Sequence, residues 1–288
     1  MDSTAPPIPS AQKFGAGAIA RGRYAPAKNQ NPSQMLNPKH WVPLLVVATL
    51  TGAGAAAQQS PIAMGTPPGW NAAMIRLFGD IKAFSAKAEL RVLDKSGKET
   101  ITLPMTFALL DRKVRMDIEM TQMKGPQVPP EQVASLKQMA MDRLACVVLP
   151  DTQMMKIIFP ALAAYVEMPL PTEETTALKK NFKIDKAPLG QETIDGHPCV
   201  KNRVTMTDEQ GQNLEFIVWS AGDLKDFPLQ AQVNDAGANV VILYKNVQFA
   251  RPDAKQFDAP AGYTRHTGFV ELMEAAALRQ GTKTSKKK

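Results

Sequence analysis

Three consecutive segments alternate apolar and polar residues with a period of two, and this pattern constrains the fold more than any other feature. Segment 84–92 has Phe, Ala, Ala, Leu and Val at even positions and Ser, Lys, Glu and Arg between them. Segments 101–109 and 114–120 alternate in the same way. Because successive side chains of a strand point to opposite faces, each segment is expected to be a strand with one buried face. Polar turns at 94–99 and 110–113 join the three into an antiparallel meander.

Helical patterns flank and interrupt the predicted strands. Apolar residues at helical spacing predict a helix near 70–81, and two prolines open a second one, predicted over 131–144. Segment 172–180 has acidic residues first and basic residues last, as the helix dipole favours. Strand patterns then return, with a turn at Asp195-Gly196, and a last helix is predicted over 269–280. The close spacing of turns favours an antiparallel sheet over βαβ units, and therefore an α+β fold that is mainly antiparallel β.

Residues 35–57 have the composition of a secretory signal peptide. Lys39 precedes an apolar run from Trp41 to Leu50, and the alanines at 55–57 fit a signal-peptidase site. The run is shorter than the roughly 20 apolar residues that a membrane-spanning helix needs. We therefore expect an exported protein, periplasmic or secreted, that does not span the membrane.

The remaining boundaries follow from composition. Residues 1–34 are rich in small and polar residues without a period, so they are either a disordered leader or the result of a misassigned start. A polar linker is expected at 58–68, one domain at 69–265, a C-terminal helix at 266–280 and a basic tail at 281–288.

The net charge of +7 does not mark a nucleic-acid-binding domain. Residues 1–57 carry +4 and residues 281–288 carry another +4, which leaves the segment 58–280 at −1. A nearly neutral domain lacks the basic face that follows a phosphate backbone. We therefore expect no nucleic acid as a partner.

Residues that commonly carry chemistry are scarce after residue 57. Cys146 and Cys199 allow one disulfide in an oxidising compartment, or else two buried apolar thiols. The histidines His197 and His266 fit no closed zinc pattern, and no nucleophile, metalloprotease or phosphate-loop motif is present. We expect no catalytic residue, no metal ion and no cofactor.

The order of elements and several short motifs resemble the LolA/LolB-like superfamily of periplasmic lipoprotein carriers. The motifs are DIKAF leading into FSAKAELRVLDKSGKE, then LLDRKVRMDIEM, and VVLPDTQMMKIIFP with AYVEMPL. QETIDGHPCVKNRV, FIVWSAGDLKDFPLQAQV and FDAPAGYTRH resemble an uncharacterised exported branch more closely. The resemblance spans 69–265 and implies an open half-barrel with helices packed in its mouth, which holds acyl chains on its concave face. Arg115 is the candidate for the arginine of the carriers, whereas the lipid-inserting loop of the outer-membrane acceptor has no counterpart.

Methionines are concentrated in the first half of the predicted domain. A flexible, polarisable thioether suits a surface for irregular apolar ligands, but it also fills an irregular core. The candidate apolar lining comprises Met105, Phe107, Val114, Met116, Ile118, Met120, Met155 and Ile157. We expect a non-enzymatic binding protein for a lipid or acyl chain, with the predicted helix 131–144 as a lid. The alternative is an envelope protein-interaction or structural module whose sheet is filled by side chains and holds no ligand.

Overall fold

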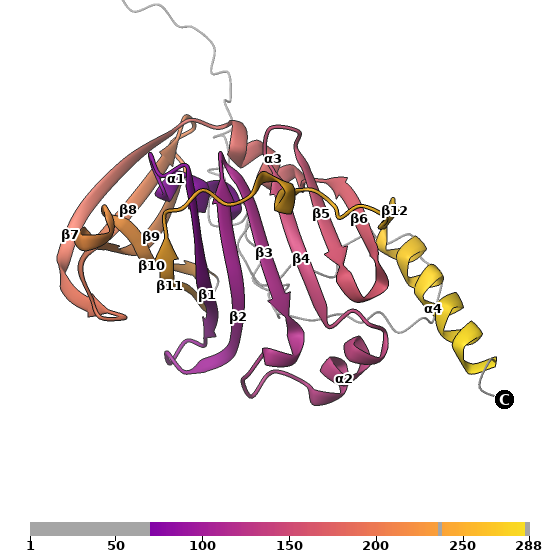
Figure 1. Cartoon of the computed structure of the whole chain (residues 1–288). Helices are drawn as coiled ribbons and strands as arrows, with labels where there is room; N and C mark the ends of the chain where they lie inside the picture. The colour runs from indigo at the N-terminus through magenta and orange to yellow at the C-terminus, as the bar shows by residue number, and fades with distance from the viewer. Residues whose placement is uncertain (1–69, 236–237, 286–288) are drawn as a thin grey trace, which may run out of the picture. The chain divides into compact units, whose positions relative to one another are not determined.

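Figure 1 shows a computed structural model of the chain, which describes residues 70–235 and 238–285. The predicted leader 1–34, signal peptide 35–57 and linker 58–68 lie outside the described residues, as does the end of the basic tail. None of the helices in the described ranges combines the length and the hydropathy needed to cross a bilayer.

Twelve strands form a single sheet in the order β12-β6-β5-β4-β3-β2-β1-β11-β10-β9-β8-β7. The strands are β1 (Ala83–Leu93), β2 (Glu99–Leu110), β3 (Lys113–Glu119), β4 (Arg143–Leu149), β5 (Met154–Phe159), β6 (Ala164–Pro169), β7 (Phe182–Ile194), β8 (His197–Asp208), β9 (Asn213–Ala221), β10 (Phe227–Asp235), β11 (Ala238–Gln248) and β12 (Thr264–His266). Neighbouring strands are antiparallel except β12 and β6, which are parallel. Since β7 and β12 are separate edges, the sheet stays open, and the predicted α+β half-barrel is confirmed.

The helices pack on one face of this sheet, which we call the inner face. Helix α1 (Trp70–Leu77) is followed by Phe78, whose ring lies 4.8 Å from Phe84 of β1 and 6.0 Å from Phe107 of β2. The other helices are α2 (Pro130–Gln138), α3 (Thr172–Lys179) and α4 (Phe269–Ser285). Leu272 of α4 belongs to the same apolar cluster as the inner-face strand residues, and Leu136 of α2 packs against it.

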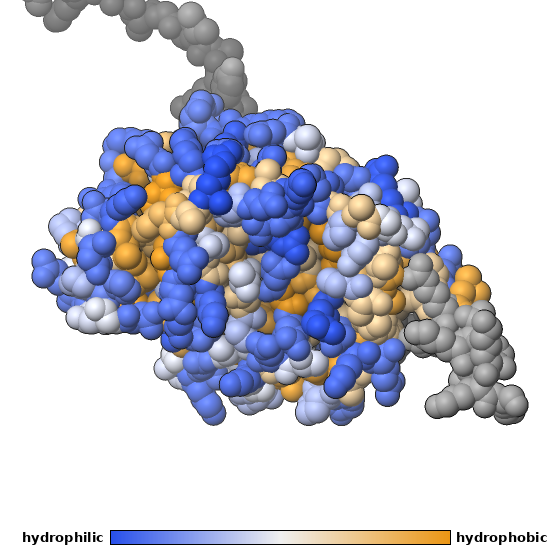
Figure 2. Space-filling model, in the orientation of Figure 1, coloured by the Kyte–Doolittle hydropathy of each residue, from blue (hydrophilic) through white to orange (hydrophobic). Residues whose placement is uncertain are grey.

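The opposite face, which we call the outer face, is crossed by a segment that we call the strap, residues 249–263. In Figure 1 the strap runs in front of the strands from β11 towards β12. Phe257 is 1% exposed and fills a second, smaller apolar cluster with residues such as Val147 and Ile158. The main-chain oxygen of Gln256 accepts a hydrogen bond from Arg115, which fixes the strap to β3. Figure 2 shows the molecule in the same orientation, with hydrophilic residues around several hydrophobic areas, of which a broad one lies at the left of the view.

Two predicted helices end earlier than the sequence pattern indicated. Helix α1 stops at Leu77 because Gly79 adopts a left-handed conformation with φ of 57°, a common way to end a helix. Helix α2 stops at Gln138, and the positive φ of 58° at Ala140 turns the chain out of the helix. The predicted end of this helix, near Leu144, is part of β4, where β-branched neighbours pair with strands on both sides.

The predicted turn at Asp195-Gly196 joins β7 to β8. Both residues have positive φ, 49° and 86°, as the two central residues of a type I′ hairpin turn require. This turn sets the register of the longest hairpin in the sheet, in which Ile194 lies opposite His197.

Candidate ligand-binding face of the sheet

Six of the eight residues predicted to line a ligand site belong to the buried inner-face apolar cluster, and the other two, Met116 and Met155, pack against it. Seven of them come from β2, β3 and β5, and Met120 follows β3 directly. Cross-strand pairing places the seven, together with their neighbours, in three rows that run outwards from β2: Met105, Ile118 and Leu144; Phe107, Met116, Cys146, Ile157 and Val166; Leu109, Val114, Val148, Met155 and Met168. The shared face follows directly from the period-two alternation, while the role in ligand binding stays a prediction.

Burial divides this set in two. Six of the eight residues are at most 7% exposed, and Ile157 is completely buried. Met116 and Met155 are half-buried, so they still present side-chain surface that other residues do not cover. Met168, which the sequence prediction omitted, is also half-buried and lies directly opposite Met155. We call Met116, Met155 and Met168 the methionine patch.

Buried Cys146 links the members of the methionine patch. Met116 of β3 lies opposite Cys146 of β4, and Met155 of β5 lies opposite Val148, two residues further along β4. Cys146 and Met155 are thus diagonal neighbours on adjacent strands, about 7–8 Å apart, whereas Met116 and Met155 lie two strands apart with β4 between them. The apolar face therefore continues from Met116 on β3, through buried residues of β4, to Met155 on β5 and Met168 on β6. Its floor is the fully buried part of the same rows.

Aromatic side chains fill the neighbouring part of the inner face. The rings of Phe78, Phe84, Phe107, Phe227 and Tyr244 pack against one another with centroid distances of 4.8 to 6.0 Å. None of these residues is more than 4% exposed. Burial raises the pKa of Tyr244 well above its ordinary value. Over β1, β2, β10 and β11 the inner face is therefore filled by the side chains of the strands and of Phe78.

Helix α2 is the least embedded of the helices near the patch. It has no fully buried residue, although Leu136 and the following Met139 pack partly against the inner-face cluster. A helix that buries little apolar area is held weakly, since burial contributes roughly 25 cal/mol per Å². The helix predicted to act as a lid is therefore α2, which ends at Gln138, and its role as a lid stays a prediction.

The two cysteines are free thiols, and the disulfide considered from the sequence is not formed. Cys146 is on β4 and Cys199 is on β8, with six strands between them in the sheet. Burial raises the pKa of the Cys146 thiol to about 12. Burial also raises the pKa of Cys199, and the nearby charge of Asp223 acts in the same direction. Neither thiol is set up as a nucleophile, because the thiolate is the reactive form.

His197 and Arg115 lie away from the methionine patch, whereas His266 of β12 pairs with Val166 of β6, at the end of the row that contains Met116. Nδ1 of His197 is 2.7 Å from Oδ2 of Asp223, and both side chains are partly exposed. His266 is buried, with Nδ1 3.2 Å from Oε1 of Glu271. In the described part of the chain, no three His, Cys, Asp or Glu side chains are grouped so that they could hold a metal ion. Arg115 projects to the outer face, where Asp117 and the strap engage it, and its role as the arginine of the carriers stays a prediction.

Comparisons with known proteins give distant similarities. No family model and no curated protein matches the sequence. A LolA superfamily protein from Nitrosomonas europaea is similar at 10% identity and a TM-score of 0.31, with 65% of this chain and 96% of that chain covered. The lipoprotein LppX from Mycobacterium tuberculosis is similar at 12% identity and a TM-score of 0.35, with coverages of 62% and 94%. A MucA/MucB complex from Pseudomonas aeruginosa is similar at 13% identity and a TM-score of 0.31, with coverages of 66% and 61%.

The LolA superfamily, which the sequence motifs resemble, is thus represented among the similar structures. The identities and TM-scores are low. The proposed function therefore depends on the residues of this chain.

Proposed function

We propose that this chain is an exported, non-enzymatic binding protein that holds an apolar ligand, a lipid or acyl chain, against the methionine patch. The observation that carries this proposal is the combination of a fully buried apolar floor with the half-buried side chains of Met116, Met155 and Met168 on one face of an open sheet. Flexible thioethers adapt to an irregular apolar partner better than branched side chains do.

The dimensions and the energetics of the patch suit an acyl chain. From β3 to β6 there are three strand spacings, which correspond to about 14 Å. Each methylene that leaves water contributes about 0.8 kcal/mol, so several methylenes laid across the patch give useful affinity without any catalytic group. Helix α2, with its weak hold on the inner face, is the segment best suited to move when a ligand enters.

Export is the second part of the proposal. It is supported by the charged residue, apolar run and alanine-rich site within residues 35–57. A periplasmic or secreted carrier would meet lipids that leave a membrane. Its apolar face would shield their acyl chains from water, which is energetically favourable.

Native mass spectrometry of the gently purified, exported protein tests this function. We expect a mass above that of the bare chain, which falls to the chain mass after organic extraction, and a lipid in the extract. We also expect the extracted protein to take up a fluorescent fatty acid. A bare-chain mass together with no uptake would contradict the proposal.

An envelope protein-interaction module is the second candidate, and the edge strand β7 favours it. Every residue of β7 between its two ends is exposed, including Ile184 at 38% and Leu189 at 45%. An edge strand offers unpaired main-chain groups to a strand of another protein. Pro188 and the irregular pairing that follows it interrupt this edge, which limits such pairing to its two ends. This module becomes the better account if no apolar ligand is found.

A further inference from the structure

A β-bulge interrupts the pairing of β1 with β11 near the middle of the sheet. Ser85 lies opposite Gln248 and Lys87 lies opposite Lys245, so β11 has one residue more than β1 in this interval. Asn246, within the bulge, has φ of 52°, in the left-handed region that residues other than glycine adopt at a cost. Bulges are frequent beside functional sites, where they redirect side chains.

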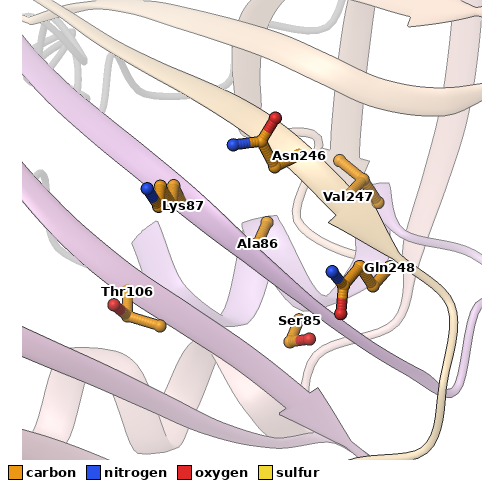
Figure 3. A pocket seen from close by; sticks show the side chains of 7 residues that line it. All are labelled: Ser85, Ala86, Lys87, Thr106, Asn246, Val247 and Gln248. Carbon is orange, nitrogen blue, oxygen red and sulfur yellow. The ribbon is translucent and has the colours of Figure 1, made fainter.

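The bulge forms one wall of a depression of about 560 Å³ that is open to solvent. Its polar lining comes from three adjacent strands and consists of Ser85, Lys87, Thr106, Asn246 and Gln248 (Figure 3). These side chains offer two hydroxyls, two carboxamides and one ammonium group. None of them makes a side-chain hydrogen bond or an ion pair with another described residue. The depression therefore presents polar groups that the fold itself does not use.

The charges around the depression do not balance. Lys87 lies directly across from Lys245, and like charges at such a position destabilise a sheet. Glu89 is the nearby carboxylate, and it is shared by Lys245 at 3.3 Å and Arg91 at 3.7 Å. In the same cross-strand row, Asp117 is engaged by Arg115. Lys87 is thus left as a positive charge without a counterion in the described part of the fold.

We propose that this depression is a binding site for a small anion that also carries hydroxyl groups, namely a polyol phosphate, either free or as a lipid headgroup. The ammonium group of Lys87 supplies the charge that a phosphate needs. The hydroxyls of Ser85 and Thr106 and the carboxamides of Asn246 and Gln248 supply donors and acceptors for the remaining oxygens. The volume is within the range of small-molecule sites.

This site is independent of the methionine patch. Ser85 and Lys87 alternate along β1 with Phe84 and Ala86, which belong to the inner-face cluster. The depression therefore opens on the outer face, and each site can be tested without the other.

Titration of the purified protein with glycerol 3-phosphate at low salt tests the proposal, with the amide chemical shifts as the readout. We expect saturable chemical-shift changes in β1 and β11 with glycerol 3-phosphate and none with glycerol. Lys87→Met should bind glycerol 3-phosphate at least about tenfold more weakly, because a charge-assisted contact is lost. Lys95→Met removes the same charge from an exposed turn and should bind like the wild type. Asn246→Gly keeps the left-handed conformation but removes the carboxamide, so a folded variant with weaker binding is expected.

Vesicles of phosphatidylglycerol, compared with phosphatidylcholine vesicles, form the second arm of the test. Binding that depends on Lys87 in the soluble arm alone identifies a free polyol phosphate, and such binding in the vesicle arm alone identifies a headgroup. Dependence on Lys87 in both arms shows that the site accepts either source. The proposal is overturned if neither probe binds saturably, if glycerol binds as well as its phosphate, or if Lys87→Met matches the wild type in both arms.

Discussion

Arg76 and Lys180 connect the ends of two helices: Nη2 of Arg76, in the last turn of α1, is 2.7 Å from the main-chain oxygen of Lys180, just after α3. The same atom is 2.8 Å from the oxygen of Ala177 and 3.1 Å from that of Leu178. Carbonyl groups in the last turn of a helix have no partner within the helix, so this guanidinium satisfies groups that would otherwise need water.

The opposite ends of these helices are joined by Glu174. Its carboxylate accepts hydrogen bonds from the main-chain N–H groups of Asn71 and Ala72, at 3.3 and 3.2 Å, in the first turn of α1. A carboxylate is favourable there because the start of a helix carries partial positive charge. Helices α1 and α3 therefore run side by side and cap each other, which helps to fix α1 on the inner face.

Replacing Arg76 by Met should lower the free energy of unfolding by about 2–3 kcal/mol, because charged hydrogen bonds to partly buried carbonyl groups are lost. Urea denaturation followed by circular dichroism measures the change. Arg112→Met is a suitable control, since Arg112 is exposed and has one ion pair at 3.5 Å with Asp151. Equal destabilisation by the two substitutions would contradict the capping role.

Asp208 should make stability depend on acidity. The hydrogen bond from Lys180, at 2.5 Å, and those from the main chain of Gln210 and Gln212 hold the pKa of Asp208 below its usual value, although its burial opposes this. A carboxyl group whose pKa is lower in the folded state stabilises fully above its unfolded pKa, about 4, and this contribution is lost as the pH falls through the folded pKa.

Asp208→Asn is therefore expected to lower the urea midpoint at pH 7 and to approach the wild-type midpoint at pH 3. Denaturation curves at both pH values provide the measurement. A difference between the two proteins that is as large at pH 3 as at pH 7 would be inconsistent with the lowered pKa.

The packing of the strap on the outer face should depend on Phe257, which is 1% exposed. Truncation to Ala leaves a cavity in the small outer cluster and should cost about 3–5 kcal/mol. Hydrogen exchange should then accelerate most in residues 249–263, with little change in β8 and β9. Uniform acceleration across the whole sheet would show that the strap does not respond as a separate unit.

The thiols of Cys146 and Cys199 should react slowly with a thiol reagent at pH 8 in the folded protein, because both are buried and have raised pKa values. In denaturant without reductant, two equivalents should react at once. An intact mass that rises by two hydrogens only after reduction would instead show a disulfide.

Local sequence patterns predicted the inner face well, because a period of two fixes the face of each residue as soon as a strand forms. The same alternation could have added Met168 to the predicted lining. On β6, Ala164, Val166 and Met168 share one face, and Tyr165 and Glu167 share the other. The alternation could not separate half-buried Met155 from buried Ile157, because that difference depends on which elements cover each row.

Features that depend on distant partners were missed. The strap has no periodic pattern, and its anchor is a single aromatic residue, Phe257. The parallel pairing of β12 with β6 joins segments about a hundred residues apart, such as Thr264 with Ala164. The bulge at Asn246 arises from the register in which β11 pairs with β1, and nothing in the local sequence specifies that register. Strand order, likewise a long-range property, decides that Cys146 and Cys199 stay apart.

Met154 and Met155 offer the most direct test of an apolar site on the inner face. They are adjacent and half-buried, but Met155 packs against the inner-face cluster, whereas the side chain of Met154 alternates to the other face. Uptake of a fluorescent fatty acid should fall about tenfold or more in Met155→Glu, because a carboxylate opposes contact with an acyl chain, and should be unchanged in Met154→Glu. Equal uptake by the two folded variants, or none by the extracted wild type, would contradict the account.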